Sequence, residues 1–264
     1  MKNIIYNMFQ IKVAKKDLFI SIFHLLKNCS TSINAVFDKD FLHIQGMDKS
    51  HICLFDLILQ KTWFEEYNVS KTINICFDTN TFFSIISMKC DNNELFIKMI
   101  DTDNDTLYIS FASNTSHKKT IKLPLLEYDY DEMNINVTEY DAEFALLSKQ
   151  ITDHFNELEH FGDDVVIKCD EKEIQCITKS VKGEMGISIP IDDLSQYSIV
   201  ENEKISLTYS IAYINKMCIT NKLSKEILFC LSNDCPMKIK YDLGINGSLS
   251  FYIAPKISDA FDED

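Results

Sequence analysis

The sequence contains no arginine, and all 26 of its basic residues are lysines. Arginine makes the commonest bidentate contact to guanine and supplies the usual arginine finger of phosphoryl-transfer enzymes. Its absence argues against sequence-specific recognition of bases and against most phosphoryl-transfer chemistry. Because Asn, Ile and Lys are abundant, an A·T-rich genome is a sufficient cause of this bias.

Glycine and proline are also scarce, with six and four residues. No apolar run approaches the ~18–20 residues that a membrane span needs. The first residues, MKNIIYNMF, lack the long apolar region and cleavage site of a secretory signal. Hydrophobic residues make up 46% of the 264, enough to bury a substantial core in one large domain or two smaller ones. We therefore expect a folded, intracellular protein.

Sequence patterns for catalysis are missing as well: there is no GxGxxG, GxxxxGK[ST], GxSxG or HExxH. The nine cysteines include no CxxC pair, and the six histidines have no metal-ligand spacing. The run DTDND at 101–105 lacks the glycine and distal glutamate of a calcium-binding loop. The sequence therefore predicts no catalytic residues, no metal site, no cofactor, and reduced, mostly buried thiols.

Strand patterns dominate, as β-branched and aromatic segments separated by Asp- and Asn-rich clusters. Turns are expected at 78–80 and 101–105. Helical periodicity occurs at about 15–28, 80–89, 148–161 and 210–218. The expected strands lie within 33–45 and at 52–59, 73–77, 94–100, 106–112, 164–170, 173–179, 185–191 and 226–231.

This order of helices and strands repeats at an offset of about 130 residues, half of the chain. We therefore predict two similar domains, 1–121 and 141–264, joined by a connecting segment at 122–140. The connecting segment is acidic and resembles a linker in composition. Its apolar residues are expected to dock on the protein surface: Leu125, Leu126, Met133 and Ile135.

Four segments have a familiar sequence. Residues 46–54 (GMDKSHICL) are similar to an MDSSHVSL segment, and 161–167 (FGDDVVI) to HIGDAVVI. Residues 233–237 (NDCPM) match an ADVPL turn, and 251–257 (FYIAPKI) a YYLAPKIEDEE ending. These are segments of the proliferating cell nuclear antigen family of DNA sliding clamps, which the chain resembles over essentially its whole length.

The resemblance implies an α+β fold, the DNA-clamp or processivity fold. Each of two similar domains would be a duplicated β-α-β-β-β unit, with sheets outside and helices lining a channel. Three subunits would close head to tail into a ring, through edge strands near 116–122 and 185–191. Such a homotrimer would encircle double-stranded DNA in the nucleus without reading its sequence, and a clamp loader would open it.

The resemblance also implies a hydrophobic pocket beside the connecting segment. There the clamp would tether DNA polymerase and other replication and repair proteins by a short peptide motif with an apolar plug and two aromatic residues. The pocket residues are expected to be Met47, His51, Ile52, Leu54, Met133, Ile135, Tyr140, Pro236, Tyr252, Ala254 and Pro255.

Lysines on the helices are expected to face the DNA phosphates. They are Lys15, Lys16, Lys27, Lys89, Lys216 and Lys222. The third helix departs from the family, because Asp153 and Asn156 stand where related clamps carry arginines, and the fourth has Ala212 and Ile219 at basic positions. Fewer phosphate contacts predict weaker DNA binding that depends less on salt.

Two other functions stay open. With a net charge of −14, the chain could be a diverged or checkpoint-type clamp subunit in a mixed ring. More remotely, carboxylates such as Asp101 and Asp103 could hold magnesium in a nuclease or a polymerase accessory enzyme. The sequence favours a sliding clamp that is not an enzyme.

Overall fold

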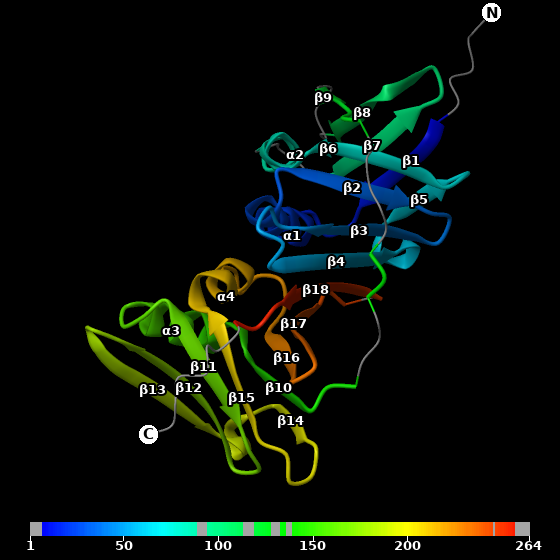
Figure 1. Ribbon diagram of the computed structural model, residues 1–264. Helices are drawn as coiled ribbons and strands as arrows, with labels where there is room; N and C mark the ends of the chain where they lie inside the picture. The colour runs from blue at the N-terminus through cyan, green and yellow to red at the C-terminus, as the bar shows by residue number, and fades with distance from the viewer. Residues whose placement is uncertain are drawn as a thin grey trace, which may run out of the picture. The chain divides into compact units, whose positions relative to one another are not determined.

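The computed structural model describes residues 7–88, 94–112, 119–127, 133–135, 139–244 and 246–256 (Figure 1). The chain divides into two compact units. Unit 1 comprises residues 1–49, 55–134 and 243–249, and unit 2 comprises residues 50–54, 135–242 and 250–264. The boundaries expected from the sequence, 1–121, 122–140 and 141–264, stay predictions.

In unit 1 the strands have the orders β5-β1-β7-β8-β9 and β4-β3-β2-β6. The described elements are β1 (Asn7–Val13), α1 (Lys16–Cys29), β2 (Ser32–Phe37), β3 (Phe41–Met47), β4 (Cys53–Gln60), the 3-10 helix η1 (Lys61–Trp63), β5 (Glu66–Val69), β6 (Ile73–Asp78), α2 (Thr79–Ile86), β7 (Glu94–Ile100), β8 (Asp103–Ala112) and β9 (Lys119–Pro124).

Unit 2 has the corresponding orders β14-β10-β16-β17-β18 and β13-β12-β11-β15. The described elements are β10 (Ala142–Leu147), α3 (Ser148–Glu159), β11 (Asp164–Cys169), β12 (Glu173–Ser180), β13 (Gly183–Pro190), the 3-10 helix η2 (Ile191–Asp193), β14 (Gln196–Ile199), β15 (Ile205–Ser210), α4 (Ile211–Met217), β16 (Glu226–Ser232), β17 (Cys235–Asp242) and β18 (Gly247–Ile253).

The predicted duplication is confirmed. In the first half, β1-α1-β2-β3-β4 is followed by β6-α2-β7-β8-β9, and in the second half β10-α3-β11-β12-β13 is followed by β15-α4-β16-β17-β18. The short strands β5 and β14 come after the first repeat of each half. All four predicted helices exist, with ends within three residues of those expected.

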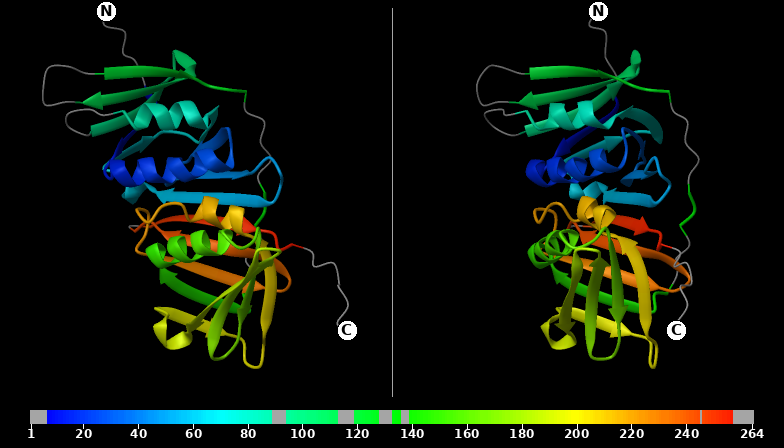
Figure 2. Two further views of the ribbon diagram at one scale, coloured as in Figure 1. Left: turned by 90° about the vertical axis from the view of Figure 1, so that its left-hand side faces the viewer. Right: turned by 60° about the vertical axis from the view of Figure 1, so that its left-hand side comes forward.

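The helices of each unit lie side by side on one face of its strands, α1 beside α2 and α3 beside α4 (Figure 2). Aromatic rings fill the interior of unit 1: Phe82 lies 4.6 Å from both Phe23 and Phe77, measured between ring centroids. In unit 2 Phe144 stacks on Phe229 at 5.1 Å. Each such pair adds about 0.5–1.5 kcal/mol beyond the burial of its area. Among the described residues, no helix has the length and apolar character that crossing a membrane requires.

The turn predicted at 78–80 was wrong, and the turn predicted at 101–105 was wrong in part. Asp78 ends β6 and caps α2, because its carboxylate accepts a hydrogen bond from the Thr81 amide at 2.7 Å. Residues 103–105 belong to β8, so the turn itself is confined to 101–102. Aspartate and asparagine favour helix caps as well as turns, so the cluster at 78–80 could not distinguish the two.

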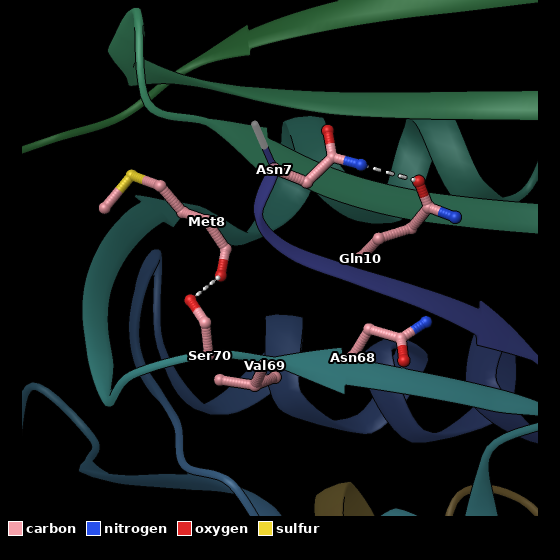
Figure 3. A pocket seen from close by; sticks show the side chains of 6 residues that line it. All are labelled: Asn7, Met8, Gln10, Asn68, Val69 and Ser70. Carbon is pink, nitrogen blue, oxygen red and sulfur yellow. Dashed lines mark hydrogen bonds between the residues drawn. The ribbon is translucent and has the colours of Figure 1, made fainter. Parts of the chain in front are cut away.

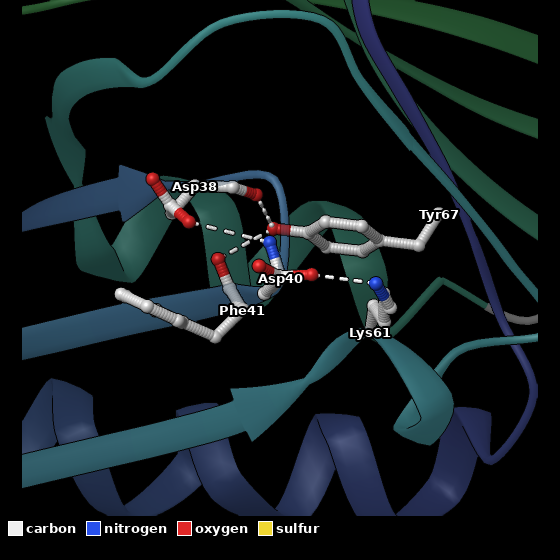
Figure 4. Close-up of polar contacts among 5 residues, drawn as sticks. All are labelled: Asp38, Asp40, Phe41, Lys61 and Tyr67. Atoms are coloured by element: carbon white, nitrogen blue, oxygen red, sulfur yellow. Dashed lines mark hydrogen bonds and ion pairs between the residues drawn. The ribbon is translucent and has the colours of Figure 1, made fainter.

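The turn between β2 and β3 is fixed by side chains from β5 and η1 (Figure 4). The Tyr67 hydroxyl lies 2.8 Å from the carbonyl oxygen of Asp38 and 2.6 Å from that of Phe41, so it can donate to either. The Lys61 ammonium pairs with Asp40 at 2.5 Å. Burial raises the pKa of Tyr67, and the two aspartates raise it further, which keeps its hydroxyl a donor. These contacts hold the start of β3, whose other end carries the first predicted pocket residue.

Trp63, the only tryptophan of the chain, is 1% exposed. Its indole N–H donates to the carbonyl oxygen of Leu243 at 3.4 Å, within unit 1. The start of β18 approaches this ring closely at Gly247, where a Cβ atom would lie 2.8 Å from the Cδ1 of Trp63. Only glycine permits that approach without displacing the indole.

We predict that Gly247→Ala lowers the free energy of unfolding by about 1–3 kcal/mol, because an added methyl group overpacks the buried indole. The matched control is Gly186→Ala, whose Cβ would meet Ile177 at 3.8 Å, an ordinary contact. Urea unfolding at two protein concentrations measures both variants and separates chain folding from subunit association. Equal effects of the two substitutions would contradict the close packing on Trp63.

Candidate functional site

The tail of the chain lies beside the first predicted pocket segment, within unit 2. The amide of Ala254 donates to the carbonyl oxygen of Ile52 at 3.2 Å. Two residues later, the amide of Lys256 donates to the carbonyl oxygen of Thr208 at 2.8 Å. The structure therefore brings together two segments that stand far apart in the sequence, 51–54 and 252–256.

These segments present apolar surface. Ile52 is 38% exposed. It follows a sharp turn, because His51 has a φ of 56° in the left-handed region that few non-glycine residues adopt. The predicted pocket residues of unit 2 that are exposed are His51, Ile52, Pro236 and Ala254, and those half-buried are Leu54, Ile135, Tyr140, Tyr252 and Pro255.

Tyr140 and the turn at 233–237 belong to the same part of unit 2. Asp141 accepts a hydrogen bond from the Asn233 amide at 3.1 Å, which ties the end of the connecting segment to this turn. Burial raises the pKa of Tyr209, and nearby groups that raise it further include Cys235 and Tyr140. Tyr140 and Cys235, which precedes Pro236, therefore both lie near Tyr209.

The connecting segment begins against unit 1. The amide of Leu125 donates to the carbonyl oxygen of Asp105 at 2.9 Å, and that of Leu126 donates to Cys76 at 2.8 Å. The side chain of Leu126 is nevertheless 46% exposed. The backbone docks as expected, while this leucine remains an apolar group on the surface.

Gln45 holds the connecting segment at a second place in unit 1. Its side-chain amide donates to the carbonyl oxygen of Met133 at 3.0 Å and accepts from the Met133 amide at 2.9 Å. Met47, two residues along β3, is half-buried. The sequence singled out Met47 and Met133 but not Gln45, which carries no signal beyond its place in a strand.

The predicted DNA-facing lysines of unit 1 differ in their surroundings. Lys15 is exposed, and the ammonium of Lys27 lies 4.1 Å from the ring centroid of Phe83. Lys16 is only 9% exposed, with its ammonium 5.0 Å from the ring of Phe111. The ammonium of Lys16 therefore packs over a ring of β8, and its expected contact with DNA stays a prediction. Lys89 lies outside the described residues.

In unit 2, Lys216 and Lys222 are exposed, and the Lys216 ammonium lies 5.0 Å from the ring of Tyr213. The outer side of α3 carries exposed Asp153, Asn156, Glu157 and Glu159. Glu159 accepts a hydrogen bond from the Asn215 amide of α4 at 2.8 Å. The weakly basic character expected of this helix pair is present in the structure.

The described cysteines are all free thiols, and seven of the eight are buried, the exception being Cys235. Burial raises the pKa of Cys176, Cys218 and Cys230 to about 12, so these thiols stay protonated and unreactive near neutral pH. Within the described residues, no group of three potential ligands could hold a metal ion. Hydrogen bonds from Tyr108 and Thr106 lower the pKa of Asp103 in its strand.

A cavity of about 310 Å³ in unit 1 lies apart from every predicted site residue (Figure 3). It is lined by Asn7, Met8 and Gln10 of β1, by Asn68 and Val69 of β5, and by Ser70, which follows β5. The Ser70 hydroxyl donates to the carbonyl oxygen of Met8 at 3.1 Å, and Asn7 donates to Gln10 at 3.2 Å. Its lining residues include no charged group that could serve in catalysis.

The strands that end the described sheets include β9 and β13. β9 is the last strand beside β8, and β13 is the last beside β12. They correspond to the edge strands expected near 116–122 and 185–191. Exposed edges of this length are templates for pairing with another chain.

Comparison with known proteins identifies the family. The family descriptions "Proliferating cell nuclear antigen, N-terminal domain" and "C-terminal domain" match residues 8–140 and 134–256. The chain therefore belongs to the proliferating cell nuclear antigen family of sliding clamps. It is 28% identical over 276 residues to "Proliferating cell nuclear antigen 1" of Plasmodium falciparum, in isolates K1 / Thailand and 3D7, across 97% of this chain and 99% of the relative.

A solved structure supports the fold. The crystal structure of Proliferating Cellular Nuclear Antigen from Entamoeba histolytica matches with a TM-score of 0.86 at 20% identity, over 96% of this chain and 100% of that one. The predicted α+β clamp fold is thus confirmed. The family consists of non-enzymatic processivity factors. Membership implies DNA and replication proteins as partners, a trimeric ring and a nuclear location.

Proposed function

We propose that this chain is one subunit of a homotrimeric ring that encircles duplex DNA and tethers DNA polymerase and repair proteins by a short peptide. The observation that carries the proposal is the hydrogen bond between Ala254 and Ile52, which sets the tail against an exposed apolar residue of the first motif. A clamp loader that opens the ring is part of the same proposal.

The peptide would bind through apolar contacts and through backbone pairing. Ile52, Leu54 and Tyr252 offer surface for a hydrophobic plug and aromatic side chains. Burying each such side chain contributes roughly 1.5–3 kcal/mol. Residues 133–135 and 254–256 can pair with an extended peptide, because they lie outside the regular strands.

A peptide with an apolar plug and two aromatics is expected to bind the wild-type protein weakly. Ile135→Ala or Tyr252→Ala should weaken this binding about tenfold or more, since each removes a large apolar contact. Val200→Ala is the matched control, because Val200 is 50% exposed and lies outside the predicted pocket. Isothermal calorimetry measures all three, and unchanged affinity in both pocket variants would refute the assignment.

Duplex DNA would be held loosely, by few phosphates. Of the lysines expected to face DNA, Lys15, Lys216 and Lys222 are exposed, and the exposed acidic residues of α3 lower the net positive charge available to phosphate. A closed ring remains on DNA by topology, so weak contacts suffice.

Replacing Lys15, Lys216 and Lys222 together by alanine should flatten the dependence of DNA affinity on salt. Each lost phosphate contact lowers the slope of log K against log salt by about 0.9. The control variant replaces Lys39, Lys172 and Lys182, which are exposed in turns between strands and change the net charge equally. Fluorescence anisotropy with a short duplex at several salt concentrations measures both, and the same slope for the two variants would argue against the helix face.

Ring closure would pair β9 of one subunit with β13 of the next. We predict a solution mass three times the 30.6 kDa of the chain at micromolar concentration, because this pairing covers the free edges of β9 and β13. Sedimentation equilibrium measures this mass. A strictly monomeric protein would count against the homotrimer, and a trimeric mass reached only with a second clamp would favour the mixed ring.

A further inference from the structure

The contact between Gln45 and Met133 joins a strand side chain to the backbone of the connecting segment. Gln45 is 5% exposed, so its amide is removed from water. Its Nε2 donates to the Met133 carbonyl oxygen at 3.0 Å, and its Oε1 accepts from the Met133 amide at 2.9 Å. Both hydrogen bonds have ordinary lengths for strong N–H···O contacts.

This pairing has the chemistry of two opposed residues in an antiparallel sheet, which exchange two hydrogen bonds. The backbone of one residue offers one hydrogen-bond donor and one acceptor. A primary amide side chain can bond to both at once, because it has an N–H donor and a carbonyl acceptor. A carboxylate could accept from the Met133 amide but would repel its carbonyl oxygen. An aliphatic side chain would satisfy neither, and would leave the Met133 groups without that partner.

The same face of β3 carries the pocket residue Met47, because side chains two positions apart in a strand point the same way. Upstream, the connecting segment is fixed by Leu125 on Asp105 and by Leu126 on Cys76. These upstream contacts are made between backbones and do not depend on any side chain. Gln45 therefore supplies a side-chain contact that holds the backbone of Met133 against the face of β3 on which Met47 stands.

We propose that Gln45 is a positioning residue that latches the connecting segment in the conformation that accepts a partner's peptide. The proposal rests on the proposed tethering function. When the latch is formed, Met133 stays docked on β3 and the peptide meets a preorganised surface. When it is absent, only a fraction of the molecules is competent, and the apparent dissociation constant rises in inverse proportion to that fraction.

The first test is hydrogen exchange of the Met133 amide, followed by mass spectrometry. In Gln45→Leu its protection is expected to fall about tenfold or more, because its acceptor is lost. The amides of Leu125 and Leu126 are internal controls and keep their protection. Gln10→Leu is the matched variant, since Gln10 lies on strand β1 of unit 1 and receives a hydrogen bond from Asn7. It should leave Met133 unchanged.

The second test uses Gln45→Glu between pH 5.5 and 8. At high pH the introduced carboxylate repels the Met133 carbonyl, and peptide affinity should fall about tenfold, as in Gln45→Leu. Once protonated, the carboxyl group again offers one donor and one acceptor, so affinity and protection should return towards wild type as the pH falls. A residue that served only to fill space would give no such recovery.

Titratable groups on this side of the sheet include His43 of β3 and Asp56 of β4, which pair at 2.7 Å, and Cys76 of β6, which lies in the same cross-strand row as Gln45. Any effect of these groups on peptide affinity and on Met133 protection also occurs in the wild type and in Gln45→Leu, so both proteins are measured over the same range of pH. The recovery attributed to the latch is the part found in Gln45→Glu alone.

The outcomes separate the latch from the tethering function. Unchanged Met133 protection in Gln45→Leu overturns the latch, whether or not a peptide binds. Reduced protection with unchanged affinity overturns its role in positioning the pocket. A wild-type protein that binds no peptide defeats the tethering function, and with it the positioning role, whatever the exchange of Met133 shows.

Discussion

Backbone hydrogen bonds from irregular segments onto neighbouring strands are the interactions on which the candidate surface depends. The tail pairs through Ala254 with Ile52, which immediately precedes β4, and through Lys256 with Thr208 of β15. The connecting segment pairs through Leu126 with Cys76 of β6. A buried amide or carbonyl without a partner loses roughly 1–3 kcal/mol, so each segment settles where a strand offers a partner. The backbone is thereby fixed while apolar side chains such as Ile52 and Leu126 remain towards solvent. Backbone hydrogen bonding therefore accounts both for the docking of these segments and for the exposure of their apolar side chains.

The charge of the helices follows from a chain that has only lysine as its cation. Lys16, Lys27 and Lys216 each place their ammonium 4–5 Å from an aromatic ring of the same unit. Such a contact is worth about 0.5–2 kcal/mol and competes with phosphate for the cation. These contacts and the acidic side of α3 both weaken binding to phosphate. They favour a protein that is retained on DNA by encircling it and not by tight contacts.

The sequence predicted the repeated order of elements because strand alternation and helical periodicity are local patterns. It placed α1, with its buried face, to within one residue at each end. It failed where one residue type serves two local structures, as at Asp78, which caps a helix and does not form a turn. It also could not show that Phe111, from a distant strand, lies beneath the ammonium of Lys16, because periodicity carries no information on tertiary contacts. Gln45 was missed for the same reason: its partner, Met133, is fixed only by the tertiary fold. The resemblance to a family supplied the pocket residues, which no periodicity would have grouped.

The buried indole of Trp63 gives the molecule an intrinsic optical reporter of one unit alone. No other tryptophan is present in the chain, and this one is shielded from water and hydrogen-bonded to a carbonyl oxygen of the same unit. Its emission should therefore lie at short wavelength in the folded protein and move to the red when unit 1 opens. Unit 2 has no tryptophan and contributes only tyrosine emission. Melting curves read by fluorescence and by circular dichroism would then diverge if the two halves of the chain lose their structure at different temperatures.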